Sequence, residues 1–311
     1  MRKLVLISVF SLCIYGLSLA PKQDVRAVSM TIGDKISASE YDLYRLLEHS
    51  RVQAYLRTWT SQLLTAKSSK TVSITAGDAG LSPQIQTAVN SMIVGRCIPQ
   101  IQRTLHFNFL GPVEVRLFTR PQDYQQAIES LGANSSNSAL MAEKTGGIAY
   151  GSRILVPLYN DRSPGSLISV LTHELTHVVF YQNSVVPAIP TWINEGTAWY
   201  EGITAGKAAA YDQFSTMLEG ADMSILQAFS HHQGVYLTAG ETALLKAPYD
   251  VEIEDYLAVS SLVKRGGMAR YVSFLHRVPE NGVQGAFRQE YGYSVNQFVA
   301  QFDRKLAHGM L

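Results

Sequence analysis

Hydrophobic positions recur along the chain with two different periods, and these periods predict a mixed fold. Apolar residues three and four positions apart indicate amphipathic helices, whereas strict alternation indicates half-buried strands. Alternation is confined to the first half of the chain, where it predicts strands at 71–76, 113–118, 148–150 and 154–158. Helical spacing predicts helices at 39–66, 82–105, 123–131, 164–183, 191–201, 207–219, 252–265, 268–277 and 294–307. Strands with helices first and helices alone afterwards predict an α+β fold.

Proline and polar residues mark where several of these elements begin or break. Ser82 and Ser163 each precede a proline, and this pair of residues is typical of a helix start. Pro99 predicts a kink or a split inside the helix at 82–105. The segment 132–146 is rich in Asn, Ser and Gly, so a loop is expected there.

The first twenty residues read as a secretory signal peptide. Arg2 and Lys3 precede an apolar run that ends in small residues at Ala20. Pro21 is unfavourable directly after a cleavage site, which leaves two alternatives. In one, cleavage occurs after Ala27 instead, and in the other the segment stays uncleaved and tethers the protein to a membrane. We therefore expect an extracytoplasmic protein, periplasmic or secreted, with a signal peptide or anchor at 1–20. An N-terminal helical extension at 21–70 and a main domain at 71–311 would follow.

Charge and cysteine content exclude two classes of function. Of 311 residues, 26 are Lys or Arg and 25 are Asp or Glu, and the formal net charge is +1. Removal of residues 1–20 leaves a net charge of −1, so the chain lacks the excess of basic residues that phosphate binding requires, and no nucleic-acid partner is expected. It also leaves Cys97 as the single cysteine, which excludes an internal disulfide and cysteine-based zinc or redox chemistry.

The pattern His173-Glu174-Leu175-Thr176-His177 carries the chemistry of the chain. Because the two histidines are four apart on a predicted helix, both imidazoles leave the same side about one turn apart. Two such imidazoles suit Zn²⁺. Glu174 lies beside the first histidine, close enough to accept a proton from metal-bound water without binding the metal itself.

A third ligand is expected from the helix that follows. Glu195 lies about one turn into the predicted helix at 191–201, and two antiparallel helices would bring its carboxylate beside His173 and His177. Two histidines and one glutamate with an open fourth position are typical of catalytic rather than structural zinc sites. Glu201, on the same helix, is a rival ligand.

The stretches HELTH and WINEGTAWYEG resemble the gluzincin metallopeptidases, in particular the bacterial secreted peptidase MA-like domains. The resemblance spans the chain from the strand at 71–76 to the C-terminal helices. It implies that Glu195 is the third zinc ligand. It also implies a two-lobe architecture for a metallopeptidase-like catalytic domain at 71–311, in which a small sheet and an active-site helix precede a helical C-terminal lobe.

The resemblance implies two further roles. Relatives use a Tyr or His of the helical lobe to stabilise the oxyanion that forms during peptide hydrolysis. Tyr256 matches that position best, and its competitors are Tyr249, His231 and His232. Relatives also pair the substrate backbone with an edge strand just before the zinc helix. That strand would come from 147–156, and the substrate-binding candidates are Ile148, Ala149 and Tyr150.

The chain departs from relatives at two places. The aminopeptidase branch carries a carboxylate before its zinc helix that holds the free amine of the substrate, but the segment 145–150 has no acidic residue. Aminopeptidase specificity is therefore not supported. Other gluzincins place an acidic residue four positions after the Glu ligand to support a zinc histidine, and here that position is Trp199. Support for the ligand must come from elsewhere.

Taken together, these residues predict a zinc-dependent peptidase that acts on a peptide or protein substrate outside the cytoplasm. The metal ligands would be His173, His177 and Glu195, with Glu174 as general base and then as acid toward the leaving amine. The alternative is a catalytically idle metallopeptidase-like protein used for binding or scaffolding. Zinc-dependent hydrolysis of a non-peptide amide is a third reading, because the chemistry of zinc and water does not depend on the leaving group.

Overall fold

The computed structural model describes residues 72–160, 163–209, 213–239 and 247–310. The predicted signal peptide or anchor and the predicted helical extension lie outside these residues. No helix in the described ranges is long and apolar enough to cross a membrane.

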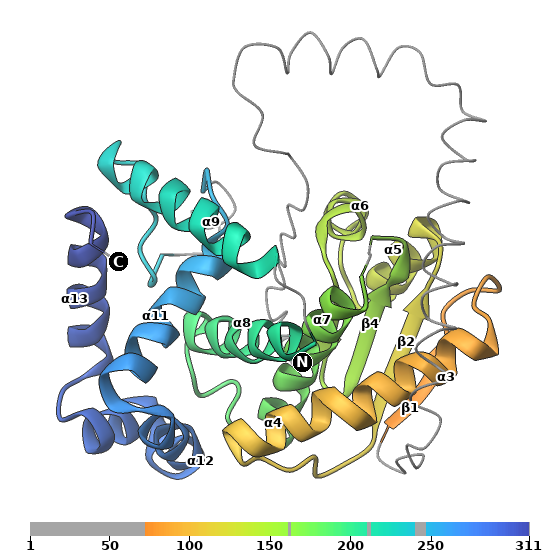
Figure 1. The fold of residues 1–311 in the computed structure, drawn as a ribbon, viewed down its shortest axis with the longest axis horizontal. Coiled ribbons are helices and arrows are strands. Elements are labelled where there is room, and N and C mark those ends of the chain that lie inside the picture. The colour runs from red at the N-terminus through yellow and green to blue at the C-terminus, as the bar shows by residue number, and fades with distance from the viewer. Residues whose placement is uncertain (1–71, 161–162, 210–212, 240–246, 311) are drawn as a thin grey trace, which may run out of the picture.

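A four-stranded sheet contains all the strands that the sequence predicts (Figure 1). Its strands are β1 (Val72–Ala76), β2 (Val113–Phe118), β3 (Ile148–Tyr150) and β4 (Arg153–Pro157). Their order is β1-β2-β4-β3, with β1, β2 and β4 parallel and β3 antiparallel to β4. The short strand β3 therefore forms one edge of the sheet.

Side chains on the two faces of the sheet belong to two different hydrophobic clusters. Val115 and Leu117 of β2 point into the large core, whereas Phe118 points into a smaller cluster on the opposite face. The large core is built with α3 (Pro83–Met92), α4 (Ile98–Leu105) and α7 (Pro164–Gln182). The smaller cluster is built with α5 (Pro121–Ser130) and α6 (Ser135–Lys144).

The remaining helices lie on the far side of α7 from the sheet (Figure 1). They are α8 (Thr191–Ala208), α9 (Gln213–Ser230), α11 (Val251–Gly266), α12 (Met268–Tyr291) and α13 (Val295–Ala307). Helix α8 packs against both α7 and α11, so it joins the sheet-bearing part to the helical part. At this coarse level the α+β prediction is confirmed.

The predicted helix starts at Ser82 and Ser163 and the predicted break near Pro99 are confirmed, and the residues that predicted them are responsible. The Ser82 hydroxyl accepts the Ile85 N–H at 3.3 Å, and the Ser163 hydroxyl accepts the Ser166 N–H at 3.2 Å, so both serines cap helices. The predicted break near Pro99 is a π-helical turn at Ile93–Cys97 that separates α3 from α4. Pro99 lies in the first turn of α4, directly after this π-helical turn, as expected where a residue without an N–H interrupts the regular hydrogen bonding of a helix.

The loop predicted at 132–146 is wrong, because the segment contains helix α6. The Asn134 side chain caps this helix by accepting the Asn137 N–H at 2.9 Å. Met141 and Ala142 of α6 are buried against the sheet and α5. The polar composition of the segment concealed the cap and the few apolar residues that hold the helix in place.

Three helices differ in extent from their predictions. Helix α8 continues to Ala208, beyond the predicted end at 201, and α9 covers 213–230 instead of 207–219. Helix α12 continues to Tyr291 instead of ending at 277, with an interruption at Gly282, whose φ of 63° is outside the helical region. These helices run on because their far ends pack against neighbouring helices, which a local pattern does not reveal.

Candidate metal centre

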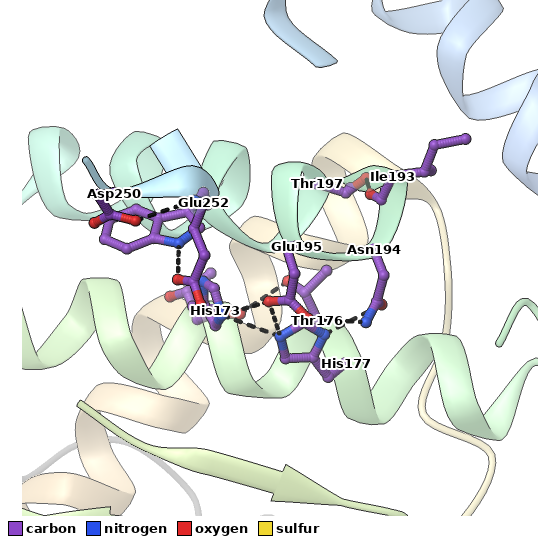
Figure 2. Close-up of polar contacts among 11 residues, drawn as sticks. His173, Thr176, His177, Ile193, Asn194, Glu195, Thr197, Asp250 and Glu252 are labelled. Atoms are coloured by element: carbon purple, nitrogen blue, oxygen red, sulfur yellow. Dashed lines mark hydrogen bonds and ion pairs between the residues drawn. The ribbon is translucent and has the colours of Figure 1, made fainter. Parts of the chain in front are cut away.

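Helices α7 and α8 bring two histidines and a glutamate together (Figure 2). Glu195 of α8 points at His173 and His177 of α7, which lie one turn apart. The Nε2 atoms of the two histidines are 3.0 Å apart. Glu195 Oε2 lies 3.3 Å from Nε2 of His177 and 3.5 Å from Nε2 of His173. All three side chains are at least 95% buried.

The spacing of these three atoms fits a metal ion. Ligands about 2.0–2.1 Å from a tetrahedral ion lie roughly 3.3 Å from one another, and the three observed distances bracket that value. Oε2 of Glu195 is buried, and its lone pairs face both ring nitrogens. His173, His177 and Glu195 therefore form a buried group that can hold a metal ion.

The protonation of the group shows that it attracts positive charge. Burial lowers the pKa of His173 to about 4. Burial acts in the same direction on His177, but the charge of Glu195 and a hydrogen bond to it outweigh burial and raise the pKa of His177 to about 9. Burial would raise the pKa of Glu195, yet the two histidines lower it to about 2. The carboxylate of Glu195 therefore favours positive charge on the neighbouring His177, in a place where a cation fits.

Asn194 contacts two members of the group. Its Oδ1 lies 3.2 Å from Nδ1 of His177, and its Nδ2 donates to Oε1 of Glu195 at 3.3 Å. The first contact favours the tautomer of His177 with the proton on Nδ1, which leaves Nε2 for a metal ion. Asn194 thereby holds one histidine and the glutamate in a fixed relation.

Trp199 and Glu252 support the other histidine. The indole of Trp199 meets the imidazole of His173 edge-on, with 5.5 Å between ring centroids and 81° between ring planes. Its Nε1–H donates to Oε2 of Glu252 at 2.7 Å. Glu252 lies in the first turn of α11 and is 3% exposed. The residue four positions after Glu195 is thus an indole that contacts His173 and is itself held by a carboxylate from another helix.

Glu174 lies between the metal-binding helix and the edge strand. It is 1% exposed, and the backbone N–H of Ala149 in β3 donates to its carboxylate. A Cβ added to Gly147 would come within 2.8 Å of its Cγ and 2.9 Å of its Oε1, so a residue without a side chain is required there. Burial raises the pKa of Glu174 to about 8.

Glu201, the rival third ligand, lies outside the group. Its Oε2 accepts hydrogen bonds from Nε2 of Gln100 at 3.3 Å and from the Thr104 hydroxyl. Both partners belong to α4, on another side of α8 from the two histidines. The structure therefore brings Glu195, and not Glu201, to His173 and His177.

The residues considered for the oxyanion lie in different surroundings. Tyr256 is half-buried on α11, and its ring packs against Tyr200 with 6.2 Å between centroids. The Tyr249 hydroxyl contacts Glu254 at 2.6 Å and the Val235 N–H at 2.9 Å, so it is already engaged. His231 and His232 are exposed at the end of α9. Among the contacts of the described residues, none joins these side chains to His173, His177 or Glu195.

The three residues considered for substrate binding form strand β3. Ile148 and Ala149 are buried, whereas Tyr150 is 40% exposed. All three residues pair with β4, Ile148 with Leu155, Ala149 with Ile154 and Tyr150 with Arg153. The Ala149 N–H is also a hydrogen-bond donor to Glu174. The edge of the sheet is therefore formed by 148–150, and its backbone adjoins the side chain expected to act as the base.

Sequence reasoning missed three residues of this site: Asn194, Glu252 and Gly147. Asn194 directly precedes the candidate ligand Glu195, and this position alone could have suggested that Asn194 supports the site. Gly147 could have been suspected because it lies in a Gly-Gly pair just before the predicted edge strand. No local signal marks Glu252, because it is 53 residues from Trp199 in the sequence.

Comparisons with known protein families, with curated proteins and with solved structures find no match to this chain. A function can therefore be inferred only from the residues and geometry of the site itself.

Proposed function

We propose that the protein is a zinc-dependent peptidase of the gluzincin type. The observation that carries the proposal is the convergence of the two Nε2 atoms and one carboxylate oxygen at distances of 3.0–3.5 Å in a buried place. Two neutral imidazoles and a carboxylate are the donors that catalytic zinc sites use, and they leave a fourth position open. His173, His177 and Glu195 would hold the ion.

A zinc ion at this site would polarise water and the carbonyl group of a bound peptide. The side chains of the protein would transfer the protons. Glu174 is adjacent to His173 and buried, with a pKa raised to about 8, so near neutral pH it can both take and return a proton. It would accept a proton from the attacking water and deliver it to the leaving amine. The Ala149 N–H fixes the orientation of its carboxylate.

The placement of the site supports a two-lobe gluzincin-like architecture. The sheet and its helices would form one lobe, and α9, α11, α12 and α13 the other, with α7 and α8 between them (Figure 1). Strand β3 supports a peptide substrate, because an edge strand beside the catalytic glutamate offers its backbone to an extended chain. An extracytoplasmic location, with cleavage or retention of the N-terminal segment, remains part of the proposal.

Tyr256 is the proposed oxyanion donor. It lies on α11, which packs on α8 beside the metal ligands, and in the described structure its ring rests on Tyr200. Removal of its hydroxyl in Tyr256→Phe should lower kcat about 100-fold with little change in zinc content. A kcat that is unchanged would assign the hydroxyl to packing alone.

Metal content and turnover of a quenched peptide library test the proposal. The wild-type chain should bind one zinc ion and cleave peptides. Glu174→Gln should retain the zinc and lose turnover, because the ligands are intact and the base is gone. Glu195→Gln should lose zinc, and the matched control Glu201→Gln should keep it, because Glu201 is bonded to α4.

Three results would overturn the proposal. Zinc bound at one per chain with no turnover of any peptide would favour the catalytically idle binding protein. Turnover of non-peptide amides alone would favour the third reading of the motif. Absence of zinc from the wild type and from all three variants would remove the site assignment altogether.

A further inference from the structure

The positive charge of the helical part is concentrated near the C-terminus. Residues 213–239 and 247–263 include six acidic residues and no lysine or arginine, whereas residues 264–310 include seven lysines and arginines and three acidic residues. These basic residues lie at the end of α11 and on α12 and α13. Helix α13 lies at the opposite end of the molecule from the sheet (Figure 1), so this end carries an excess of positive charge that is remote from the sheet.

Two exposed arginines lie where α11 ends and α12 begins. Arg265 donates to the Tyr293 hydroxyl at 2.7 Å and to Oε1 of Gln301 on α13 at 3.3 Å. Its guanidinium carbon is 5.6 Å from the centroid of the Tyr293 ring. The side chain of Arg270 lies against Gly266, because a Cβ there would come within 2.8 Å of Cδ of Arg270. The two arginines therefore border the same junction between helices, and one of them reaches α13.

Helix α13 continues this surface with two more exposed basic residues. Arg304 and Lys305 lie three and four residues after Gln301, so they share a helix face with the residue that Arg265 contacts. At the end of the helix, the Met310 N–H donates to the Lys305 carbonyl at 2.9 Å. This bond places Met310, which is 54% exposed, beside the basic pair. The C-terminal basic surface is defined here as Arg265, Arg270, Arg304, Lys305 and Met310.

The four basic side chains of this surface have no acidic partner among the described residues. None of the ion pairs in these ranges includes any of them. The nearby carboxylates are engaged elsewhere, since Glu290 is paired with Arg277 at 2.6 Å and Asp303 accepts the Leu237 N–H. The positive charge of the surface is therefore available to an anionic partner.

The side chains beside these charges favour a lipid surface as that partner. Basic residues attract the anionic headgroups of a membrane, and an exposed apolar side chain among them can enter the boundary between headgroups and hydrocarbon. Met310 provides such a side chain. Tyr293, beside Arg265, is of the type that is enriched at membrane surfaces. The sequence also predicts an N-terminal segment that is cleaved during export or stays in a membrane, so a membrane surface would be within reach.

We propose that the C-terminal basic surface docks onto a membrane that contains anionic phospholipids. Each lysine or arginine close to such a membrane strengthens binding about fivefold, so four strengthen it about 600-fold. The attachment is reversible and weakens with salt, because the charges are exposed. A retained N-terminal segment would make it intramolecular and stronger. Because α7 and α8 lie between α13 and the sheet (Figure 1), docking would leave strand β3 accessible.

A fluorophore on α13 tests the proposal with the full chain. Ala307→Cys in a Cys13→Ser background gives one exposed labelling site, because Cys97 is buried. Acrylodan at 307 should shift its emission to the blue on phosphatidylcholine vesicles with about 30% phosphatidylglycerol, but not on phosphatidylcholine alone. The same label at Ala139→Cys on α6 should shift on neither. Since the label reports contact at α13 itself, an N-terminal segment that inserts into both kinds of vesicle would not imitate the result.

Removal of two charges from α13 provides the quantitative test. The double variant Arg304→Gln/Lys305→Gln should raise the vesicle concentration for the half-maximal shift about 25-fold. The charge-matched control Arg116→Gln/Lys144→Gln removes two exposed charges near the sheet and should leave that concentration unchanged. Equal thermal unfolding of the two double variants would show that both are folded.

Four results would overturn the proposal. The label at 307 could show no shift on the anionic vesicles, which would favour an acidic protein as the partner. It could shift equally on neutral vesicles, which would make the contact apolar rather than electrostatic. The α13 double variant could bind as the wild type does, or the control double variant could weaken binding as much as the α13 variant.

Discussion

The indole of Trp199 touches the imidazole of His173 edge-on, with 5.5 Å between ring centroids. The same indole donates to Glu252 on α11, so a metal-binding side chain of α7 is supported by a carboxylate two helices away. This contact passes through α8, which also supplies Glu195 and Asn194. The candidate metal centre therefore depends on how three helices pack against one another.

Replacement of Trp199 should weaken both the fold and the metal centre. Trp199→Phe keeps an aromatic ring beside His173 but leaves the Glu252 carboxylate without its donor. We expect the free energy of unfolding in urea to fall by about 1–3 kcal/mol. Zinc affinity, measured by competition with a chelator, should fall as well. Trp192→Phe is the matched control, because the buried Nε1 of Trp192 has no hydrogen-bond partner, and it should leave zinc affinity unchanged.

Removal of the Asn194 side chain should loosen two ligands at once. Asn194→Ala abolishes the contacts with His177 and Glu195. Loss of a residue that orients metal ligands typically lowers metal affinity about 10–100-fold, and we expect that range here. Asn194→Asp keeps an oxygen for Nδ1 of His177 and should recover part of the loss. Equal zinc affinities for Asn194→Ala and the wild type would contradict the assigned role.

A methyl group at position 196 should separate α8 from α11. A Cβ on Gly196 would lie 2.2 Å from the backbone oxygen of Asp255, and backbone atoms cannot move aside as a flexible side chain does. Gly196→Ala should therefore lower the Tm sharply and reduce zinc content. Gly220→Ala is the control, since a Cβ there meets nothing within 4 Å. As a helical position it should gain about 0.5–1 kcal/mol of stability.

Glu201 should make stability fall as pH rises. Burial is the main cause that raises the pKa of Glu201 from 4.5 to about 7. A carboxyl group with a raised pKa favours the folded state in its protonated form. Its contribution is complete below pH 4.5 and is lost as pH rises through about 7. The loss is at most about 3 kcal/mol, from 1.36 kcal/mol per unit.

Glu201→Gln should remove this dependence. The glutamine oxygen can still accept hydrogen bonds from Gln100 and Thr104, so packing is preserved. We expect the variant to be more stable than the wild type at pH 8 and similar at pH 5, as measured by urea unfolding at both values. A wild-type stability that rises between pH 5 and pH 8 by the same amount as the variant's would refute the assigned pKa.

The parts of the fold that follow from local spacing were predictable. His173 and His177 share a helix face because any four-residue spacing on a helix does so, and the apolar alternation located all four strands. The helix cap at Ser163 was predictable because the local pair Ser163-Pro164 is typical of a helix start. The approach of Glu195 to the histidines was expected from the resemblance, since its spacing alone left Glu201 open as a rival.

The parts that depend on packing between distant segments were not predictable. The burial of Met141 and Ala142 of α6 against another helix is one such contact, although residues 139–144 of this helix are themselves good helix formers. Trp199 and Glu252 meet only when α11 lies across α8.

The close contact at Gly196 has a mechanical consequence. Glu195 is the next residue, and the backbones of α8 and α11 touch there with no side chain between them. A displacement of α11 would be transmitted to Glu195 without being absorbed by rotation of a side chain. The helical part is thus in direct backbone contact with the turn of α8 that carries Glu195, and a shift of α11 should move that carboxylate relative to His173 and His177.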